Sequence, residues 1–100
     1  MGKLKEIAYG RSGDKGRDAN IAIIAYKEED YEKLLQFLTE TRVSNFLSDL
    51  NIDKITRYEL PNLYAVNFVL EGVLDRGGSL SLRSDAQGKG LAQYLLEIEC

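Results

Sequence analysis

The alternation of apolar and polar positions predicts two strands at the start of the chain. Residues 4–9 read as a first strand that ends at Gly10. Residues 19–26 form a nearly continuous apolar run, which is typical of a central strand covered on both faces. The short polar segment between the two runs predicts a hairpin connection.

Helical periodicity follows the second strand. Four apolar residues with the spacing of one helical stripe come after three acidic residues: Tyr31, Leu34, Leu35 and Leu38. The same spacing recurs over residues 43–50 with a shifted phase. The shift predicts either a second helix that begins near Thr39 or Thr41, or one bent helix.

The second half of the chain repeats this order. Residues 54–60 read as a third strand that stops at Pro61, because the run is rich in β-branched and aromatic side chains. Residues 62–74 fit either a helix or a strand; alternation favours a strand through Leu70, paired with the third.

A last helix is predicted near the carboxyl end of the chain. Gly77-Gly78 predicts a turn, and Ser84 with Gln87 three residues later forms a capping-box pattern at a helix start. The apolar stripe of this helix is predicted to face inward: Leu91, Tyr94, Leu95 and Ile98.

The order strand, strand, helix, strand, strand, helix defines an expected fold class. It is an α+β domain with a four-stranded sheet packed against helices, in the order ββαββα. Joining the ends of this order gives the split βαβ arrangement of ferredoxin-like folds, in permuted form. A chain of 100 residues has the length of one domain, spanning residues 1–100.

Composition excludes several kinds of chemistry. The chain has no histidine and one cysteine, Cys100. A zinc site of Cys/His type, a histidine-activated nucleophile and imidazole acid–base catalysis are therefore excluded within the chain. We expect no metal, no cofactor and no catalysis by the chain alone.

Charge and hydropathy restrict the kinds of partner that we expect for the chain. The net charge of −3 argues against nucleic-acid binding. Residues 1–17 carry five positive and two negative side chains, and residues 28–53 carry seven negative and two positive ones. This asymmetry can steer an anion or align two copies of the chain. No apolar stretch reaches the ~20 residues that span a bilayer, so we expect a cytoplasmic protein without membrane contact.

The strongest candidate for chemistry is the segment 10–16, expected to be a loop. It is dense in glycine and charge: Gly10, Arg11, Ser12, Gly13, Asp14, Lys15 and Gly16. Glycines let a ligand approach the main chain, whose N–H groups can form an anion-binding concavity. A guanidinium fork, an ammonium group and a hydroxyl add donors. The alternative is an ordinary glycine-rich hairpin loop with solvated charges.

Two further groups have polar side chains in notable places. Arg57, Glu59 and Asn62 surround the corner after the third strand, and Asn67 lies inside an apolar run. Such an amide is satisfied by the backbone or faces a ligand. Arg83 precedes the last helix, where an anion could contact exposed N–H groups; simple capping is the alternative.

An ordered series of motifs resembles a known family. The motifs are IAYGRSGDKG at 7–16, Asn20-Ile21, RYELPN at 57–62, NFVL at 67–70, Gly72, SLR at 81–83 and DAQGK at 85–89. Together they resemble the carboxy-terminal ferredoxin-fold domain of AtuA-like proteins, a family named for bacterial utilisation of acyclic terpenes. The resemblance extends over nearly all of the chain.

The resemblance implies partners more directly than a reaction. In the family, this domain usually follows a larger amino-terminal domain, which the present sequence does not contain. The resemblance therefore implies either a subunit that docks on a separately encoded AtuA-like large protein, or a homo-oligomer. It adds Asn20 to the candidate ligand-binding residues. After the last glycine of the segment 10–16 the chain has Arg17, where the family tends to have a small or acidic residue.

Three functions are consistent with these observations. The first is a non-catalytic accessory or interaction domain in terpenoid or branched acyl metabolism. The second is a binding module for an anionic metabolite such as an acyl-CoA, contacted by Arg11, Lys15 and Arg83. The third is a small subunit of a hydratase or lyase, for which Asp14, Lys15 and Glu59 are the acid–base candidates.

Overall fold

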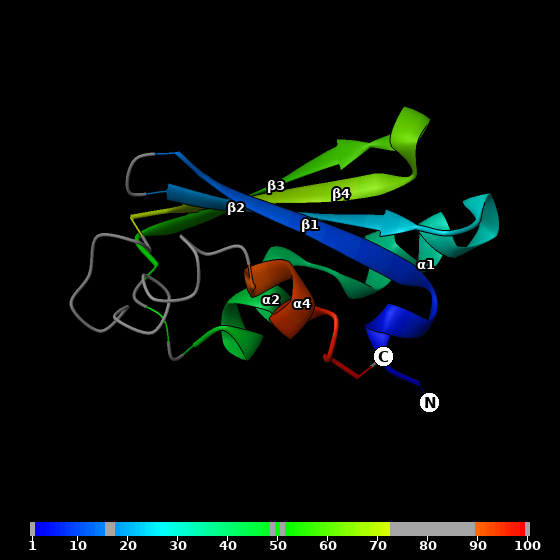
Figure 1. The fold of residues 1–100 in the computed structure, drawn as a ribbon, viewed down its shortest axis with the longest axis horizontal. Helices are drawn as coiled ribbons and strands as arrows, with labels where there is room; N and C mark the ends of the chain where they lie inside the picture. The colour runs from blue at the N-terminus through cyan, green and yellow to red at the C-terminus, as the bar shows by residue number, and fades with distance from the viewer. Residues whose placement is uncertain (1, 16–17, 49, 51, 73–89, 100) are drawn as a thin grey trace.

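The computed structural model of the chain describes residues 2–15, 18–48, 50, 52–72 and 90–99 (Figure 1). In chain order, its elements are η1 (Leu4–Glu6), β1 (Ala8–Lys15), β2 (Asp18–Ala25), α1 (Glu28–Phe37), α2 (Glu40–Phe46), β3 (Lys54–Leu60), η2 (Pro61–Leu63), β4 (Ala65–Glu71) and α4 (Leu91–Leu95), where η marks a 3₁₀ helix. The predicted order of strands and helices is confirmed.

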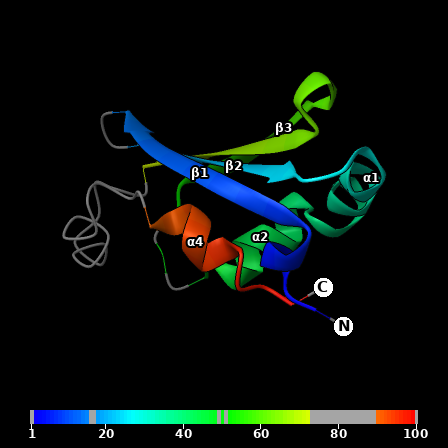
Figure 2. The ribbon, with the colours of Figure 1, turned by 45° about the vertical axis from the view of Figure 1, so that its right-hand side comes forward.

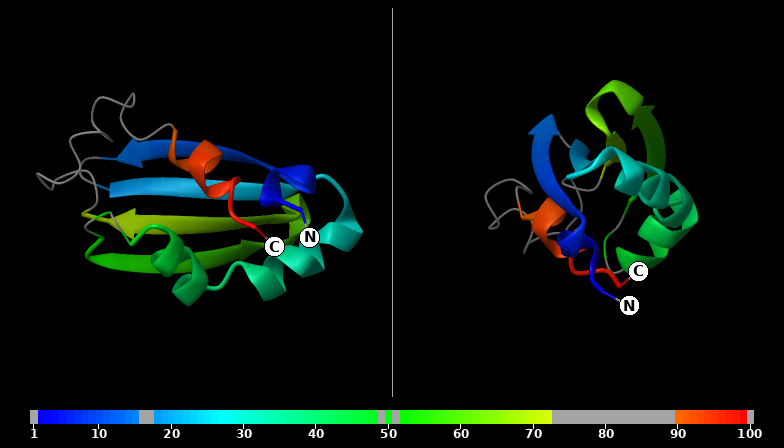
Figure 3. Two further views of the ribbon diagram at one scale, coloured as in Figure 1. Left: turned by 90° about the horizontal axis from the view of Figure 1, so that it is seen from below. Right: turned by 90° about the vertical axis from the view of Figure 1, so that its right-hand side faces the viewer.

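The four strands form one sheet in the order β1-β2-β4-β3, and every neighbouring pair is antiparallel. Figure 3 shows this order from below, with β1 and β3 at the two edges. The connection through α1 and α2 joins β2 to β3, and β4 lies between them. This is the split βαβ arrangement in permuted form, as the sequence predicts.

Helices α1, α2 and α4 of the described residues lie on one side of the sheet, as Figures 1 and 2 show. Burial alternates along β2: Ile21 and Ile23 are fully buried, whereas Ala22 and Ile24 on the other face are half-buried. The prediction that this strand is covered on both faces is therefore wrong. Its apolar residues on the second face are shielded by neighbouring strands rather than by a helix.

The core lies between the sheet and the helices. Phe68 and Leu70 of β4 are fully buried, and each helix contributes buried residues, such as Leu34 of α1, Val43 of α2 and Leu95 of α4. Helix α4 covers β1 and β2, and α2 covers β3 (Figure 3). Within the described residues, the sheet therefore has a helix-covered face and a face without a helix, the open face.

The predicted first strand at residues 4–9 is wrong in position. Residues Leu4–Glu6 form a 3₁₀ helix, and β1 runs from Ala8 through Gly10 to Lys15. The reason is tertiary: the N–H groups of Leu4 and Lys5 donate to the carbonyls of Ile98 and Leu96 over 2.9 and 3.0 Å. The carboxyl-terminal segment, and not a strand of the sheet, thereby supplies the hydrogen-bond acceptors for Leu4 and Lys5.

Two ambiguities of the sequence are resolved. Thr39 is the N-cap of α2, and its side chain accepts a hydrogen bond from the Arg42 N–H over 3.1 Å, so there are two helices. The segment 62–74 contains the strand β4, as alternation predicts, while the helical reading is wrong.

The last predicted helix is confirmed in part. Leu91, Leu95 and Ile98 are buried as expected, but Tyr94 is 51% exposed and lies against the Phe46 ring, with centroids 5.0 Å apart. The inward position predicted for Tyr94 is wrong. The predicted turn at 77–78, the capping box at 84–87 and Arg83 lie outside the described residues.

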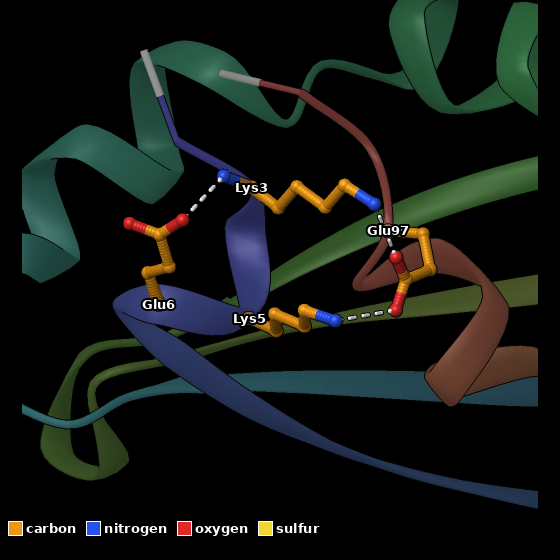
Figure 4. A network of polar contacts seen from close by, with 4 residues as sticks. All are labelled: Lys3, Lys5, Glu6 and Glu97. Atoms are coloured by element: carbon orange, nitrogen blue, oxygen red, sulfur yellow. Dashed lines mark hydrogen bonds and ion pairs between the residues drawn. The ribbon is translucent and has the colours of Figure 1, made fainter.

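The two terminal segments lie side by side and are joined by ion pairs (Figure 4). The ammonium groups of Lys3 and Lys5 contact the two carboxylate oxygens of Glu97 over 2.8 and 3.0 Å. The Lys3 hydrogen bond lowers the pKa of Glu97 below its ordinary value of 4.5, with help from Lys5. The same contact raises the pKa of Lys3 above 10.5.

These shifts predict how the contribution of Glu97 to stability depends on pH. A lowered carboxyl pKa stabilises the fold above the unfolded-state value and ceases to do so as the pH falls through the folded-state value. The raised Lys3 pKa stabilises below its unfolded-state value and ceases to do so as the pH rises through its folded-state value.

We therefore expect the difference in urea midpoint between the wild type and Glu97→Gln to be constant at neutral pH. It should shrink as the pH falls below the ordinary carboxyl pKa of 4.5 and as the pH rises above the ordinary lysine pKa of 10.5. The matched variant Glu32→Gln, on the exposed side of α1, should show no such profile. A Glu97→Gln difference that persists at about pH 2 would contradict the ion pairs.

Gly72 directly follows β4 and has a left-handed backbone conformation, with a φ of 78°. Its N–H donates to Asp18 Oδ1 over 2.8 Å, and a Cβ here would collide with the Asp53 carboxylate. We expect Gly72→Ala to lower the free energy of unfolding by about 2 kcal/mol, measured by urea titration. Gly13→Ala should cost less than about 1 kcal/mol, since its Cβ would meet only the movable Asn20 Oδ1. Equal costs would contradict this account.

Candidate functional site

The segment 10–16 forms mainly a strand rather than a loop. Register pairs run without a break from Gly10–Ile23 to Lys15–Asp18, so residues 10–15 belong to β1. Among the described glycines, Gly72 alone has a positive φ. An extended backbone sends successive N–H groups in opposite directions and does not form a concavity. The prediction of a loop at 10–15 is wrong, and Gly16 lies outside the described residues.

Gly10 of β1 allows close packing against helix α4. A Cβ at Gly10 would meet the Ala92 Cβ at 3.0 Å and the Ile23 Cδ1 at 3.1 Å. Helix α4 can therefore lie directly on β1. The adjacent N–H of Ala92 points to Ser12 Oγ at 3.4 Å, which places Ser12 on the helix-covered face as well.

The alternation of β1 divides the candidate residues between the two faces. Gly10 and Ser12 belong to the helix-covered face, whereas Arg11 and Gly13 belong to the open face. A single site that uses Arg11 and Ser12 together is not formed. The sequence did not reveal this division, because a run of glycine and charged residues does not look like a strand.

The open face combines residues from all four strands. Register and alternation assign to it Tyr9, Arg11, Gly13, Asp18, Asn20, Ala22, Ile24, Lys54, Thr56, Tyr58, Leu60, Ala65, Asn67, Val69 and Glu71. They form rows across the strands in the order β1-β2-β4-β3. Among the described residues, no helix packs on this face (Figure 1).

A polar cluster occupies the middle of the open face. One row reads Arg11, Ala22, Asn67 and Tyr58, and Asn20 stands in the next row. Asn20 and Asn67 are diagonal neighbours on adjacent strands, a placement that puts Cα atoms about 7–8 Å apart. The structure thus brings together three predicted site residues, Arg11, Asn20 and Asn67, from three strands.

The two amides of this cluster are available to a ligand or partner. Both side chains are half-buried, and within the described part of the chain neither makes a side-chain hydrogen bond. Arg11 is exposed. Half-buried amides normally acquire hydrogen-bond partners, so a surface of this kind is suited to contact with another molecule.

An aromatic and aliphatic row borders the polar cluster. Tyr9 is 43% exposed and lies against Tyr26, with ring centroids 5.3 Å apart. Leu60 stands at the far side of the same row, with Ile24 and Ala65 between. Tyr31 is the one buried tyrosine among the described residues. The alternation of tyrosine with polar residues along the strands is the sequence signal that groups these exposed residues on one face.

The group around Arg57 is structural. The Arg57 Nη1 donates to the carbonyls of Leu35 and Leu38 over 2.8 and 3.0 Å, and its Nη2 contacts Glu59 Oε2 at 2.9 Å. These carbonyls end α1, where a cation is favoured. Asn62 is exposed in η2, away from the polar cluster.

The acid–base candidates are not assembled into one site. Asp14 and Lys15 belong to β1, and Glu59 belongs to β3 at the opposite edge of the sheet. Burial raises the pKa of the Tyr31 hydroxyl, and the nearby Glu59 carboxylate adds to this. The phenol therefore stays protonated at neutral pH.

Metal and membrane sites have little support in the described residues. Residues 2–15, 18–48, 50, 52–72 and 90–99 contain no group of three His, Cys, Asp or Glu side chains that could hold a metal ion. In the same part of the chain, no helix is long and apolar enough to cross a membrane.

The strand order and the one-sided helical layer define a permuted ferredoxin-like α+β domain. The family model of the AtuA ferredoxin-like domain matches residues 2–100. The chain therefore belongs to the AtuA ferredoxin-like family, which confirms the resemblance noted in its motifs. No curated protein and no solved structure matches this sequence.

Proposed function

We propose that this chain is an accessory domain of an AtuA-like system, and that the open face of its sheet binds another polypeptide. The observation that carries the proposal is the exposure of this face. Tyr9, Tyr58 and Leu60 are 43%, 51% and 37% exposed on a four-stranded surface. Exposed apolar side chains that form a contiguous patch with polar groups mark interaction sites.

The composition of the face suits a protein partner. Tyrosine and arginine are enriched at interface centres, where tyrosine combines a large apolar area with a hydroxyl. The partner is a separately encoded AtuA-like large protein or another copy of the chain. Membership of the AtuA ferredoxin-like family supports a proposed role in terpenoid or branched acyl metabolism.

Co-purification tests this function. Tagged chain, mixed with an AtuA-like large protein or passed alone over a size-exclusion column, should form a complex. Tyr58→Ala combined with Leu60→Ser should weaken that complex at least tenfold. Tyr94→Ala, a substitution of an exposed tyrosine on α4, should leave it intact. A chain that is monomeric and retains no large protein would overturn the proposal.

A second candidate function is the binding of an anionic metabolite. It is favoured by the position of Arg11 beside two amides without side-chain partners. A guanidinium with amide donors suits a carboxylate or phosphate. Acyl-CoA should then raise the melting temperature of the wild type but not of Arg11→Ala. An equal increase in both would remove Arg11 from such a site.

A further inference from the structure

We propose that the open face binds a second copy of this chain, with a twofold axis parallel to the strands. This inference rests on the proposed interaction function and names its partner. In such a dimer each sheet packs on the other with strands nearly aligned, as in β-sandwiches. Strand β1 of one copy then lies over β3 of the other, and β2 lies over β4.

The size of the face fits this use. Strands of seven or eight residues are about 23–26 Å long, and four of them span about 19 Å, so the face covers roughly 440–500 Å² in projection. Its accessible area is larger, because side chains stand out from the sheet. The face therefore has the size of a weak or transient interface, below the ~800 Å² that each partner contributes to a standard one.

The register decides the direction of the axis. An axis parallel to the strands keeps each row opposite the same row of the partner, with the strand order reversed. The row of Tyr9 and Leu60 then meets itself, so apolar side chains cover apolar side chains. An axis across the strands would instead place this row on the charged row of Asp18 and Lys54, at a large cost in desolvation.

The central row supplies the most specific contact. With the axis parallel to the strands, Arg11 of one copy stands over Tyr58 of the other, and symmetry makes this contact twice. A guanidinium over a tyrosine ring is favourable. The uncommitted amide of Asn67 faces Ala22 near the axis, where it is close to its own symmetry mate.

The charged row lies at one end of the face. It forms the rim of the proposed interface, where polar groups stay accessible to water. The carboxylate of Asp18 already accepts the Gly72 N–H over 2.8 Å. Like charges at this rim therefore oppose the dimer only weakly at physiological ionic strength.

Sedimentation of the purified chain, with a charge exchange at the central row, tests the proposal. The wild type should dimerise at about 100 µM. Arg11→Glu and Tyr58→Lys alone should each raise the dimer Kd roughly tenfold or more. The double variant should restore a Kd near that of the wild type, because the new carboxylate faces the new ammonium group.

The rescue has no intramolecular explanation. Within one chain, Arg11 and Tyr58 are on opposite edge strands, separated by three strand spacings of about 4.8 Å. The matched control Arg42→Glu reverses an exposed charge on α2 and should leave the Kd unchanged. A loss of dimer in Arg42→Glu equal to that in Arg11→Glu would overturn the proposed face.

The remaining outcomes separate this inference from the proposed function. A wild type that is monomeric at about 100 µM overturns the dimer. If that monomer still binds an AtuA-like large protein through Tyr58 and Leu60, the interaction function stands. Single variants that weaken the dimer without rescue by the double variant overturn the proposed axis.

Discussion

Replacement of Phe68 by alanine is expected to lower the free energy of unfolding by about 4 kcal/mol. Phe68 is fully buried in β4, a central strand, and belongs to the single cluster between sheet and helices. Truncation removes its buried apolar area and leaves a cavity that rigid neighbours cannot fill. For a domain with 5–15 kcal/mol of total stability, this is a large fraction. Urea unfolding followed by circular dichroism gives the value.

Tyr58→Ala provides the matched control for Phe68. It removes an aromatic side chain of similar size from the same sheet, but from the open face, where Tyr58 is 51% exposed. We expect a loss below about 1 kcal/mol at concentrations where the chain is monomeric. A loss comparable to that of Phe68→Ala would show that the open face is covered within the monomer.

Replacement of Arg57 by leucine is expected to cost about 2–3 kcal/mol. The guanidinium satisfies the carbonyls of Leu35 and Leu38 at the end of α1, and its side chain is only 22% exposed. Leucine keeps the apolar stem but leaves both carbonyls without this donor. The loss is measured as a shift of the urea midpoint at constant m value.

Two further variants separate capping from charge. Arg57→Lys keeps the charge and a nitrogen donor for the two carbonyls, which share Nη1, but loses the Nη2 contact with Glu59, so we expect an intermediate loss. Arg42→Ala removes an exposed guanidinium that lies over the Phe37 ring at 4.5 Å, and should cost less than about 1 kcal/mol. If Arg57→Leu were as mild as Arg42→Ala, water would be satisfying the α1 carbonyls.

Much of the fold follows from local patterns in the sequence. The stripe of Leu34 and Leu38 predicts α1, and alternation through Phe68 favours β4. The phase shift after Leu38 allows either a second helix from Thr39 or Thr41 or one bent helix, and the structure decides for α2. These elements have strong periodicity, and the helix and strand periods differ enough to be recognised without tertiary information. The order of elements then restricted the topology to a permuted ferredoxin-like sheet.

The position of β1 could not be read in the same way. Its glycines and charges have low strand propensity, and the strand forms because β2 offers partners along its whole length and α4 packs against Gly10. Tertiary context overrides local propensity in such cases. Conversely, Leu4 reads as a strand residue but is buried in a 3₁₀ turn held by the carboxyl-terminal segment.

The candidate site was predictable in its residues but not in its form. Arg11, Asn20 and Asn67 were singled out and do share one face, although they are 9 and 47 residues apart along the chain. Their assembly depends on strand order and register, which a single sequence does not specify. Tyr9, Tyr58 and Leu60 were missed because their exposure depends on which face of the sheet the helices cover, and alternation in a single strand does not specify that face.

The contact between the two ends of the chain has a consequence for chain connectivity. Leu4 and Ile98 are hydrogen-bonded neighbours, so a short linker could join Lys3 to Glu99 without moving any strand. If that closed ring were then cut between β1 and β2, the chain would read βαββαβ, the unpermuted ferredoxin order. The two connectivities thus differ only in which junction is covalent: β1 to β2 in this chain, or the amino-terminal to the carboxyl-terminal segment in the unpermuted order. The core and the open face are the same in both.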